Sequence, residues 1–143
     1  MGLKRIDHIG VAVEDAAKAA RIFCELLGTD PAGEEDLESE GLKVISVAAG
    51  EDTIEFFEPT RAEHTVRRFL DKRGNALHHI CIEVDDLDAE LARLDKLGAE
   101  LVDRTPRSGA QARRVAFLHP RSTGGVLIEL SERGGTGPRD LAP

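Results

Sequence analysis

The chain has 143 residues, of which 41% are hydrophobic and 32% charged, and these proportions are ordinary for a single globular domain. Nineteen basic and 27 acidic side chains give a formal net charge of −8, which argues against nucleic acid or an anionic membrane as the main partner. No apolar run approaches the roughly 18 residues of a membrane span, and the N-terminus has no apolar signal core. Cys24 and Cys81 show no metal-binding spacing and no disulfide framework. We therefore expect a cytoplasmic protein with neither a nucleic-acid nor a membrane partner.

Residues 8–13 alternate apolar side chains with small or polar ones, which is the pattern of a strand. A helix is expected next, because Asp15 offers an N-cap, apolar residues recur at helical spacing, and Gly28 ends the run. Residues 33–41 are acidic and turn-rich and are expected to be irregular. Two further strands are expected, at residues 42–49 and 53–58.

The same plan then occurs a second time, with His79 aligned to His8 at a shift of 71 residues (79 − 8). In this copy Asp86 is the expected N-cap and Gly98 ends the helix. Repetition of this kind indicates two copies of one structural unit. Residues 60–73, between the copies, are predicted to form a linking helix. The second copy continues with an irregular segment at residues 105–112 and strands at residues 114–119 and 125–130.

Each copy carries one histidine on its first strand and one glutamate on its last strand. They are His8 and Glu55 in the first copy and His79 and Glu129 in the second. Strand alternation places them opposite the apolar face that packs on the helix. If the two sheets curve toward each other, two imidazoles and two carboxylates meet, a donor set that suits Co²⁺, Ni²⁺, Mn²⁺ or Zn²⁺. A single histidine on a strand is ordinarily a packing or surface residue, so the prediction depends on the set of four.

Six segments together resemble a known family. They are residues 6–13 (IDHIGVAV), 53–59 (TIEFFEP), 69–74 (FLDKRG), 78–85 (HHICIEVD), 117–120 (FLHP) and 125–130 (GVLIEL). The chain resembles the vicinal oxygen chelate superfamily over about residues 4–132, and within it the methylmalonyl-CoA epimerases are the most similar.

This resemblance implies an α+β fold in which two βαβββ modules form a cupped mixed sheet around one metal site. The expected organisation is a single domain over residues 1–132, with modules at about 4–58 and 77–131 joined by the helix at about 60–73. Residues 133–143 bury too little to order themselves and are expected to be a disordered tail.

The resemblance also implies an isomerase that interconverts the two epimers of methylmalonyl-CoA, or of a close acyl-CoA such as ethylmalonyl-CoA. Such an enzyme removes the α-proton and passes through a metal-stabilised enolate. His8, Glu55, His79 and Glu129 would be the metal ligands, with Co²⁺ the expected ion, and Glu129 would also be the acid/base group. Some relatives carry a second glutamate base where this chain has Val44, so the second base stays open. A homodimer is expected from the same resemblance.

The stretch from residue 104 to residue 121 is locally basic, and Arg107, Arg113 and Arg114 are candidates to bind the phosphates of coenzyme A. A solvated arginine-rich loop explains the same residues equally well. The family's loop often reads Gly-Ala-x-Gly, whereas this chain has Ala112 in place of the last glycine.

Three other functions are alternatives to the epimerase. A glyoxalase I-type lyase or isomerase can use the same two histidines and two glutamates but binds a glutathione adduct. A ring-cleaving dioxygenase typically needs one carboxylate, which would leave Glu55 without a role. A non-catalytic binder of small molecules would lack a complete metal set and would favour aromatic stacking surfaces, whereas this chain has no Trp or Tyr.

Overall fold

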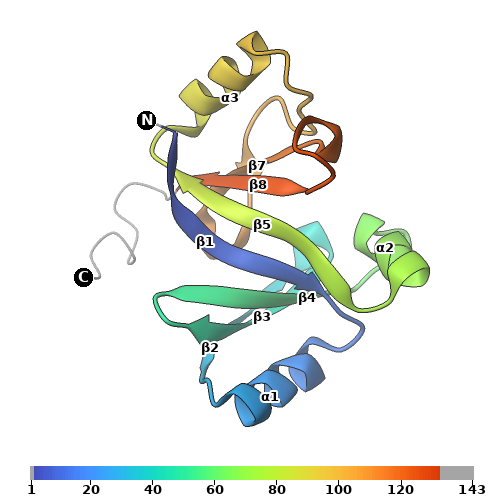
Figure 1. Ribbon diagram of the computed structural model, residues 1–143. Helices are drawn as coiled ribbons and strands as arrows, with labels where there is room; N and C mark the ends of the chain where they lie inside the picture. Colours follow the sequence, from blue (N-terminus) through green and yellow to red (C-terminus); the bar gives the residue numbers. More distant parts are fainter. Residues whose placement is uncertain (1, 133–143) are drawn as a thin grey trace. The chain divides into compact units, whose positions relative to one another are not determined.

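A computed structural model describes residues 2–132, and these residues form an α+β fold of helices and mixed β-strands (Figure 1). The chain divides into two compact units. Among the described residues, the continuous unit is residues 8–78, and the split unit combines residues 2–7 with residues 79–132. Two strands, β1 (Leu3–Ala12) and β5 (Ala76–Val84), cross this division and contribute residues to both units.

In the continuous unit the hydrogen-bonded strand order is β2-β3-β4-β1. Strand β1 runs parallel to β4, and the other neighbours are antiparallel. The elements of this unit, besides its part of β1, are α1 (Ala16–Leu27), β2 (Pro31–Leu37), β3 (Leu42–Ala49), β4 (Asp52–Pro59) and α2 (Thr65–Arg73).

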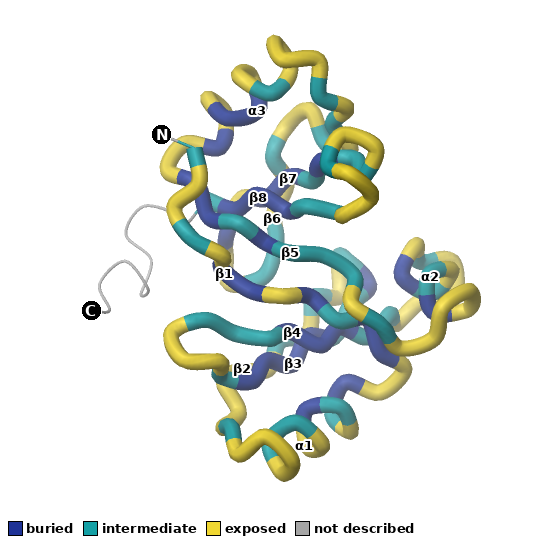
Figure 2. The backbone as a smooth tube through the Cα atoms, viewed as in Figure 1, coloured by how far each residue is buried: buried dark blue, intermediate teal, exposed yellow. Residues whose placement is uncertain are grey.

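The two helices of the continuous unit pack on opposite faces of its sheet. Helix α1 covers the face that carries Ile45, Val47 and Phe56. Helix α2 packs at one end of the other face, against Val44 and Phe57. Figure 2 shows buried residues along β3 and β4 and exposed residues along α1. Only part of the second face is therefore covered by a helix of this unit.

In the split unit the strand order is β1-β5-β8-β7-β6. Strand β8 is parallel to β5 and antiparallel to β7. Helix α3 packs on one face of this sheet, with Leu87 and Leu91 against Ala116, Leu118 and Leu130. The elements, besides the parts of β1 and β5, are α3 (Leu87–Lys96), β6 (Arg107–Ser108), β7 (Arg114–Leu118) and β8 (Ile128–Glu132).

The repeated helix starts follow the sequence prediction. The Asp15 carboxylate accepts a hydrogen bond of 3.0 Å from the Lys18 amide, and the Asp86 carboxylate accepts one of 3.0 Å from the Ala89 amide. The fold class is confirmed, and the order strand, helix and three strands occurs twice, as β1-α1-β2-β3-β4 and β5-α3-β6-β7-β8. No helix among the described residues is long and apolar enough to cross a membrane.

Several element boundaries differ from the sequence prediction; strand β1, for example, begins at Leu3 rather than at residue 8, and the segment predicted to be irregular at residues 105–112 contains β6. The acidic segment predicted to be irregular forms edge strand β2, because backbone pairing with β3 leaves its charged side chains in solvent. The linking helix begins only at Thr65, because the His64 side chain caps it by accepting a hydrogen bond from the Val66 amide. Strand β8 begins at Ile128 rather than at residue 125. The predicted disordered tail lies outside the described residues.

The turn between β6 and β7 is backbone-strained. Gln111 and Ala112 have φ angles of 60° and 57°, and the Arg113 amide donates a 3.3 Å hydrogen bond to the Ala110 carbonyl. Positive φ at both central residues is the signature of a type I′ turn, which favours Asn-Gly. A left-handed conformation costs a non-glycine residue about 1–2 kcal/mol. The missing glycine of the family pattern therefore leaves Ala112 in a conformation that glycine adopts freely.

Ala112→Gly is expected to raise the free energy of unfolding by about 1 kcal/mol, because glycine relieves the left-handed strain. Urea denaturation followed by circular dichroism measures the change. The matched control is Ala92→Gly in exposed, regular helix α3, which is expected to lower stability by a similar amount. A loss of stability in both variants would contradict the assignment of strain to Ala112.

Candidate metal site

The continuous unit brings His8 of β1 together with Glu55 of β4. His8 Nδ1 lies 3.3 Å from Glu55 Oε2, and both side chains are buried. The contact follows from strand register, since Gly10 pairs with Glu55 and His8 lies two residues before Gly10 on the same side of the strand. The parallel pairing of β1 with β4 therefore positions both groups.

The split unit repeats this arrangement with His79 of β5 and Glu129 of β8. His79 Nε2 lies 2.9 Å from Glu129 Oε1, again with both side chains buried or nearly so. Cys81 is the register partner of Glu129, and His79 lies two residues before Cys81. Each unit thus presents one histidine and one carboxylate with the same strand pairing and the same two-residue offset.

The two pairs differ in the residues that flank the carboxylate. Glu55 lies beside Gly10 of β1 and opposite Ser46 of β3. Glu129 lies beside Cys81 of β5 and opposite Phe117 of β7. The carboxylate of the continuous unit therefore has small neighbours, whereas that of the split unit has a thiol and an aromatic ring.

The spacing within each pair fits ligands of one ion. Two ligands that are each about 2.1 Å from an ion, at a right angle, lie about 3.0 Å apart. The distances of 3.3 Å for His8–Glu55 and 2.9 Å for His79–Glu129 are close to that separation. Imidazole and carboxylate donors are also the types that divalent first-row ions accept. The donors within each unit fit a divalent metal.

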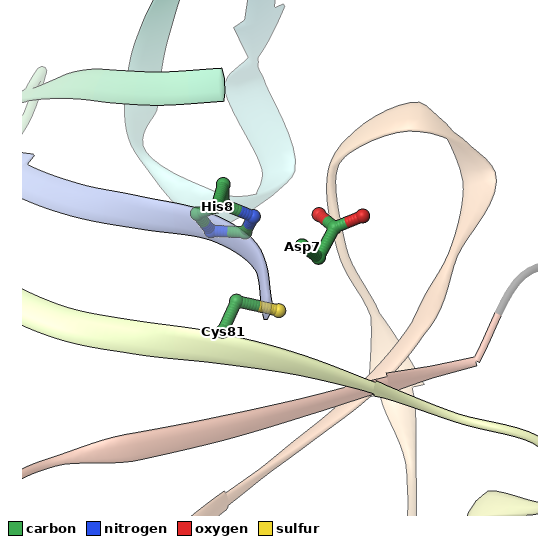
Figure 3. Close-up of side chains that lie close together, drawn as sticks. All are labelled: Asp7, His8 and Cys81. Carbon is green, nitrogen blue, oxygen red and sulfur yellow. The ribbon is translucent and has the colours of Figure 1, made fainter. Parts of the chain in front are cut away.

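A buried ion pair in the split unit joins Asp7 of β1 to Arg113, the residue directly before β7. Arg113 donates from Nη1 to the Asp7 carboxylate and from Nη2 to Gln111 Oε1 at 2.7 Å. Asp7 and Arg113 are 1% and 4% exposed. Figure 3 shows Asp7 with its neighbour on β1, His8, and with Cys81 of β5, whose sulfur lies within 4.8 Å of an Asp7 carboxylate oxygen. Nη1 and Nη2 of Arg113 therefore each donate a hydrogen bond to an acceptor within the protein.

The Asp7 carboxylate belongs to a larger group of charges. Arg5 Nη1 lies 3.8 Å from Asp7 and 3.5 Å from the buried Glu83 carboxylate. Lys4 Nζ lies 3.4 Å from Glu83 and 3.2 Å from the exposed Asp85. The hydrogen bond to Asp85, and then that to Glu83, raises the pKa of Lys4. The positive charges of Arg5 and Lys4 therefore offset the negative charges of the buried Asp7 and Glu83 carboxylates.

The locally basic stretch is neutralised by carboxylates from elsewhere in the fold. Its five arginines each form an ion pair: Arg104 with Asp95, Arg107 with Asp103, Arg113 with Asp7, Arg114 with Asp88 and Glu132, and Arg121 with Glu100. The Asp88 hydrogen bond is the main cause that raises the pKa of Arg114. The three arginines proposed from the sequence to bind phosphates differ in exposure. The Arg107 and Arg114 side chains are 49% and 46% exposed, whereas Arg113 is buried.

Arg107 lies close to the metal ligand of its unit. Its guanidinium carbon is 5.3 Å from the centre of the Phe117 ring. The Phe117 ring in turn meets the His79 ring edge to face, with 5.5 Å between ring centres. A half-exposed cation is therefore separated from His79 by a single aromatic ring.

Two buried polar residues near the site, Ser46 and Asp7, were not predicted from the sequence, and the role of the position of Val44 was not settled by it. Ser46, which interrupts an apolar strand, is 5% exposed and lies opposite Glu55. Asp7 precedes a predicted ligand, and its alternation pattern gave no reason to expect a buried charge. Val44, at the position of a possible second base, is buried against Phe57 and α2 and has Glu35 of β2 as its cross-strand partner.

Comparison with known proteins identifies relatives over most of the chain. The model of the glyoxalase/bleomycin resistance protein/dioxygenase superfamily matches residues 7–117. An uncharacterised protein of Bacillus subtilis is 38% identical over 130 residues, covering 91% of this chain and 93% of its own length. The human mitochondrial methylmalonyl-CoA epimerase is 34% identical over 131 residues, covering 91% and 74%.

A solved structure of a methylmalonyl-CoA epimerase in complex with methylmalonyl-CoA and ammonium is similar in fold, with a TM-score of 0.88 at 30% identity. The match covers 95% of this chain and 99% of that one. The similarity of this chain to that epimerase structure therefore extends over both units.

Asp7→Asn is expected to lower the free energy of unfolding by about 3–5 kcal/mol, because it leaves the Arg113 charge buried without its partner. Chemical denaturation measures the loss. Asp85→Asn is the matched control: its carboxylate also pairs with a cation but is 64% exposed, so the expected change is below about 0.5 kcal/mol. Equal effects of the two substitutions would show that the Asp7–Arg113 pair does not stabilise the fold.

Proposed function

Because the chain belongs to the methylmalonyl-CoA epimerases of the glyoxalase/bleomycin resistance protein/dioxygenase superfamily, it is an isomerase, and we propose that it interconverts the (R) and (S) forms of methylmalonyl-CoA. Ethylmalonyl-CoA is the second substrate that we propose. The observation that carries the proposal is the histidine–glutamate pair that occurs in each unit with the same register.

We further propose that His8, Glu55, His79 and Glu129 together hold one divalent ion, with Co²⁺ expected and Ni²⁺, Mn²⁺ or Zn²⁺ as alternatives. Support comes from the ligand-like spacing within each pair and from the low exposure of all four side chains. When bound, the ion supplies Lewis-acid stabilisation of the negative charge that develops on the substrate oxygens, worth several kcal/mol.

Glu129 is the residue that we assign to proton transfer. The His79 ring lies 2.9 Å from Glu129 Oε1, and a carboxylate positioned in this way can accept the α-proton of the acyl group and return it. Phe117 lies opposite on β7 and, with the low exposure of the carboxylate, limits access of water to the transferred proton. Val44 carries no titratable group and therefore cannot supply a second acid/base group, so whether one carboxylate or two move the proton stays open.

Arg107 and Arg114 are the arginines that we propose to bind the phosphates of coenzyme A. Both are about half exposed, and exposed ion pairs are weak enough to exchange one anion for another. Arg113, the third candidate, would have to leave Asp7 buried without its partner in order to do the same. A homodimer remains part of the proposal.

Exchange of the substrate α-proton tests the proposed reaction. Methylmalonyl-CoA in deuterated buffer is followed by NMR with metal-stripped protein, with and without added Co²⁺. Exchange is expected only with the metal, and Glu129→Gln is expected to slow it about 10²–10⁴-fold, the usual contribution of a general acid or base. The same assay with ethylmalonyl-CoA tests the second substrate.

The matched control is Glu132→Gln, which removes a carboxylate from the same strand at a position paired with Arg114. It is expected to leave the exchange rate within about twofold, since Glu132 is not one of the proposed ligands. Absence of exchange with every metal would exclude the epimerase reaction and would make the glutathione hemithioacetal the next substrate to test.

Arg107→Ala is expected to raise KM for methylmalonyl-CoA about tenfold while kcat changes little, because one charge-assisted contact to a phosphate is lost. The pantetheine thioester of methylmalonate lacks the nucleotide phosphates, so its KM should be the same in wild type and variant. Arg104→Ala, which removes a more exposed arginine paired with Asp95, serves as the control. An equal rise in KM for both thioesters would instead place Arg107 against the acyl carboxylate.

A further inference from the structure

We propose that Asp7, Gln111 and Arg113 form a clamp that holds the β6–β7 turn in its left-handed conformation and so places Arg107 for substrate binding. The role of Arg107 rests on the proposed function, whereas the effect of the clamp on the turn does not. Arg113 is on this view a positioning residue, and its guanidinium does not contact the substrate.

The first support is the set of contacts that Arg113 makes. Its guanidinium joins Asp7 of β1 to Gln111 at the centre of the turn, although Asp7 and Arg113 are 106 residues apart in sequence. Both members of the ion pair are almost fully buried. Breaking such a pair is costly, because the remaining partner keeps an uncompensated charge. The turn is thus attached to β1 by an interaction that solvent screens little.

The second support is that the turn needs an external restraint. Gln111 and Ala112 both occupy the left-handed region without being glycine or asparagine. Gly109 is in close contact as well, since a Cβ there would lie 2.9 Å from a methyl group of Val115. Strained backbone persists when surrounding structure determines it, and the clamp supplies that restraint at Gln111.

The third support is the connection from the turn to the metal ligand. Strand β6 consists of Arg107 and Ser108, directly before the turn, and its register with β7 pairs Arg107 with Val115. Arg107 in turn rests on Phe117, which packs on His79. A two-residue strand has little pairing of its own, so the geometry of the turn decides whether Arg107 stays over Phe117.

The experiment removes the clamp with Arg113→Met and relieves the left-handed backbone strain at residue 112 with Ala112→Gly. Four proteins are compared: wild type, Arg113→Met, Ala112→Gly, and the double variant. Amide hydrogen exchange of Gly109 and Arg113, whose N–H groups close the turn, reports on its conformation without any ligand. Calorimetric titration with coenzyme A and the kcat for methylmalonyl-CoA report on function. Arg104→Met is the control for loss of an exposed arginine.

Arg113→Met is expected to speed exchange of the two turn amides at least tenfold and to weaken coenzyme A binding about tenfold, with kcat within about twofold of wild type. Adding Ala112→Gly should restore most of both losses, because glycine holds the left-handed conformation without restraint.

Two results would overturn the proposal. Restored amide protection without restored coenzyme A affinity would mean that Arg113 contacts the ligand directly. Unchanged turn amides in Arg113→Met would mean that the clamp does not hold the turn. Failure of the proposed function has a different signature: wild-type protein would neither bind coenzyme A nor exchange the substrate proton, while the amide measurements would still decide whether the clamp exists.

Discussion

Parallel pairing of β1 with β4 and of β5 with β8 is the constraint on which the rest of the site depends. A parallel pair fixes which residues lie side by side, so a histidine two residues before the register partner of a glutamate meets that glutamate without help from a loop. The helices then cover the opposite faces, where alternation puts the apolar side chains. The same strands carry both the candidate metal ligands and the core residues. The two sets differ only in the face of the sheet toward which their side chains point.

Much of this arrangement could be predicted from sequence, because it follows local periodicity and repetition. Alternating residues around His8 and His79 indicated the strands, Asp15 and Asp86 marked the helix starts, and the repeat paired the histidines and glutamates. Edge strand β2 was not predictable in the same way. Its acidic residues have no apolar partner to set a period, and it is a strand because β3 offers it backbone hydrogen bonds.

Long-range charge pairing was the other part that the sequence did not reveal. Residues 104–121 contain no acid, yet each arginine of this stretch pairs with a carboxylate from outside it. Arg113 is the extreme case, because its partner Asp7 is 106 residues away and buried. Counting charges over residues 104–121 alone therefore overestimates the positive charge available near the site. Gln111 and Ala112 are also residue types that normally avoid the left-handed backbone conformation, so only the glycine that the family pattern has at position 112 pointed to it.

The division of β1 and β5 between the two units links their folding. Each unit completes its sheet with half of a strand whose other half belongs to its companion, and the covalent backbone passes from one to the other between Asp7 and His8 and between His78 and His79. Residues 8–12 of β1 pair with β4 in the continuous unit, whereas residues 3–7 belong to the split unit, so loss of the whole strand would weaken both units. Cutting the chain in the linker before α2 would separate residues 3–7 of β1 from the other strands of the split unit. The duplicated halves are therefore expected to melt as one cooperative body, despite their separate hydrophobic cores.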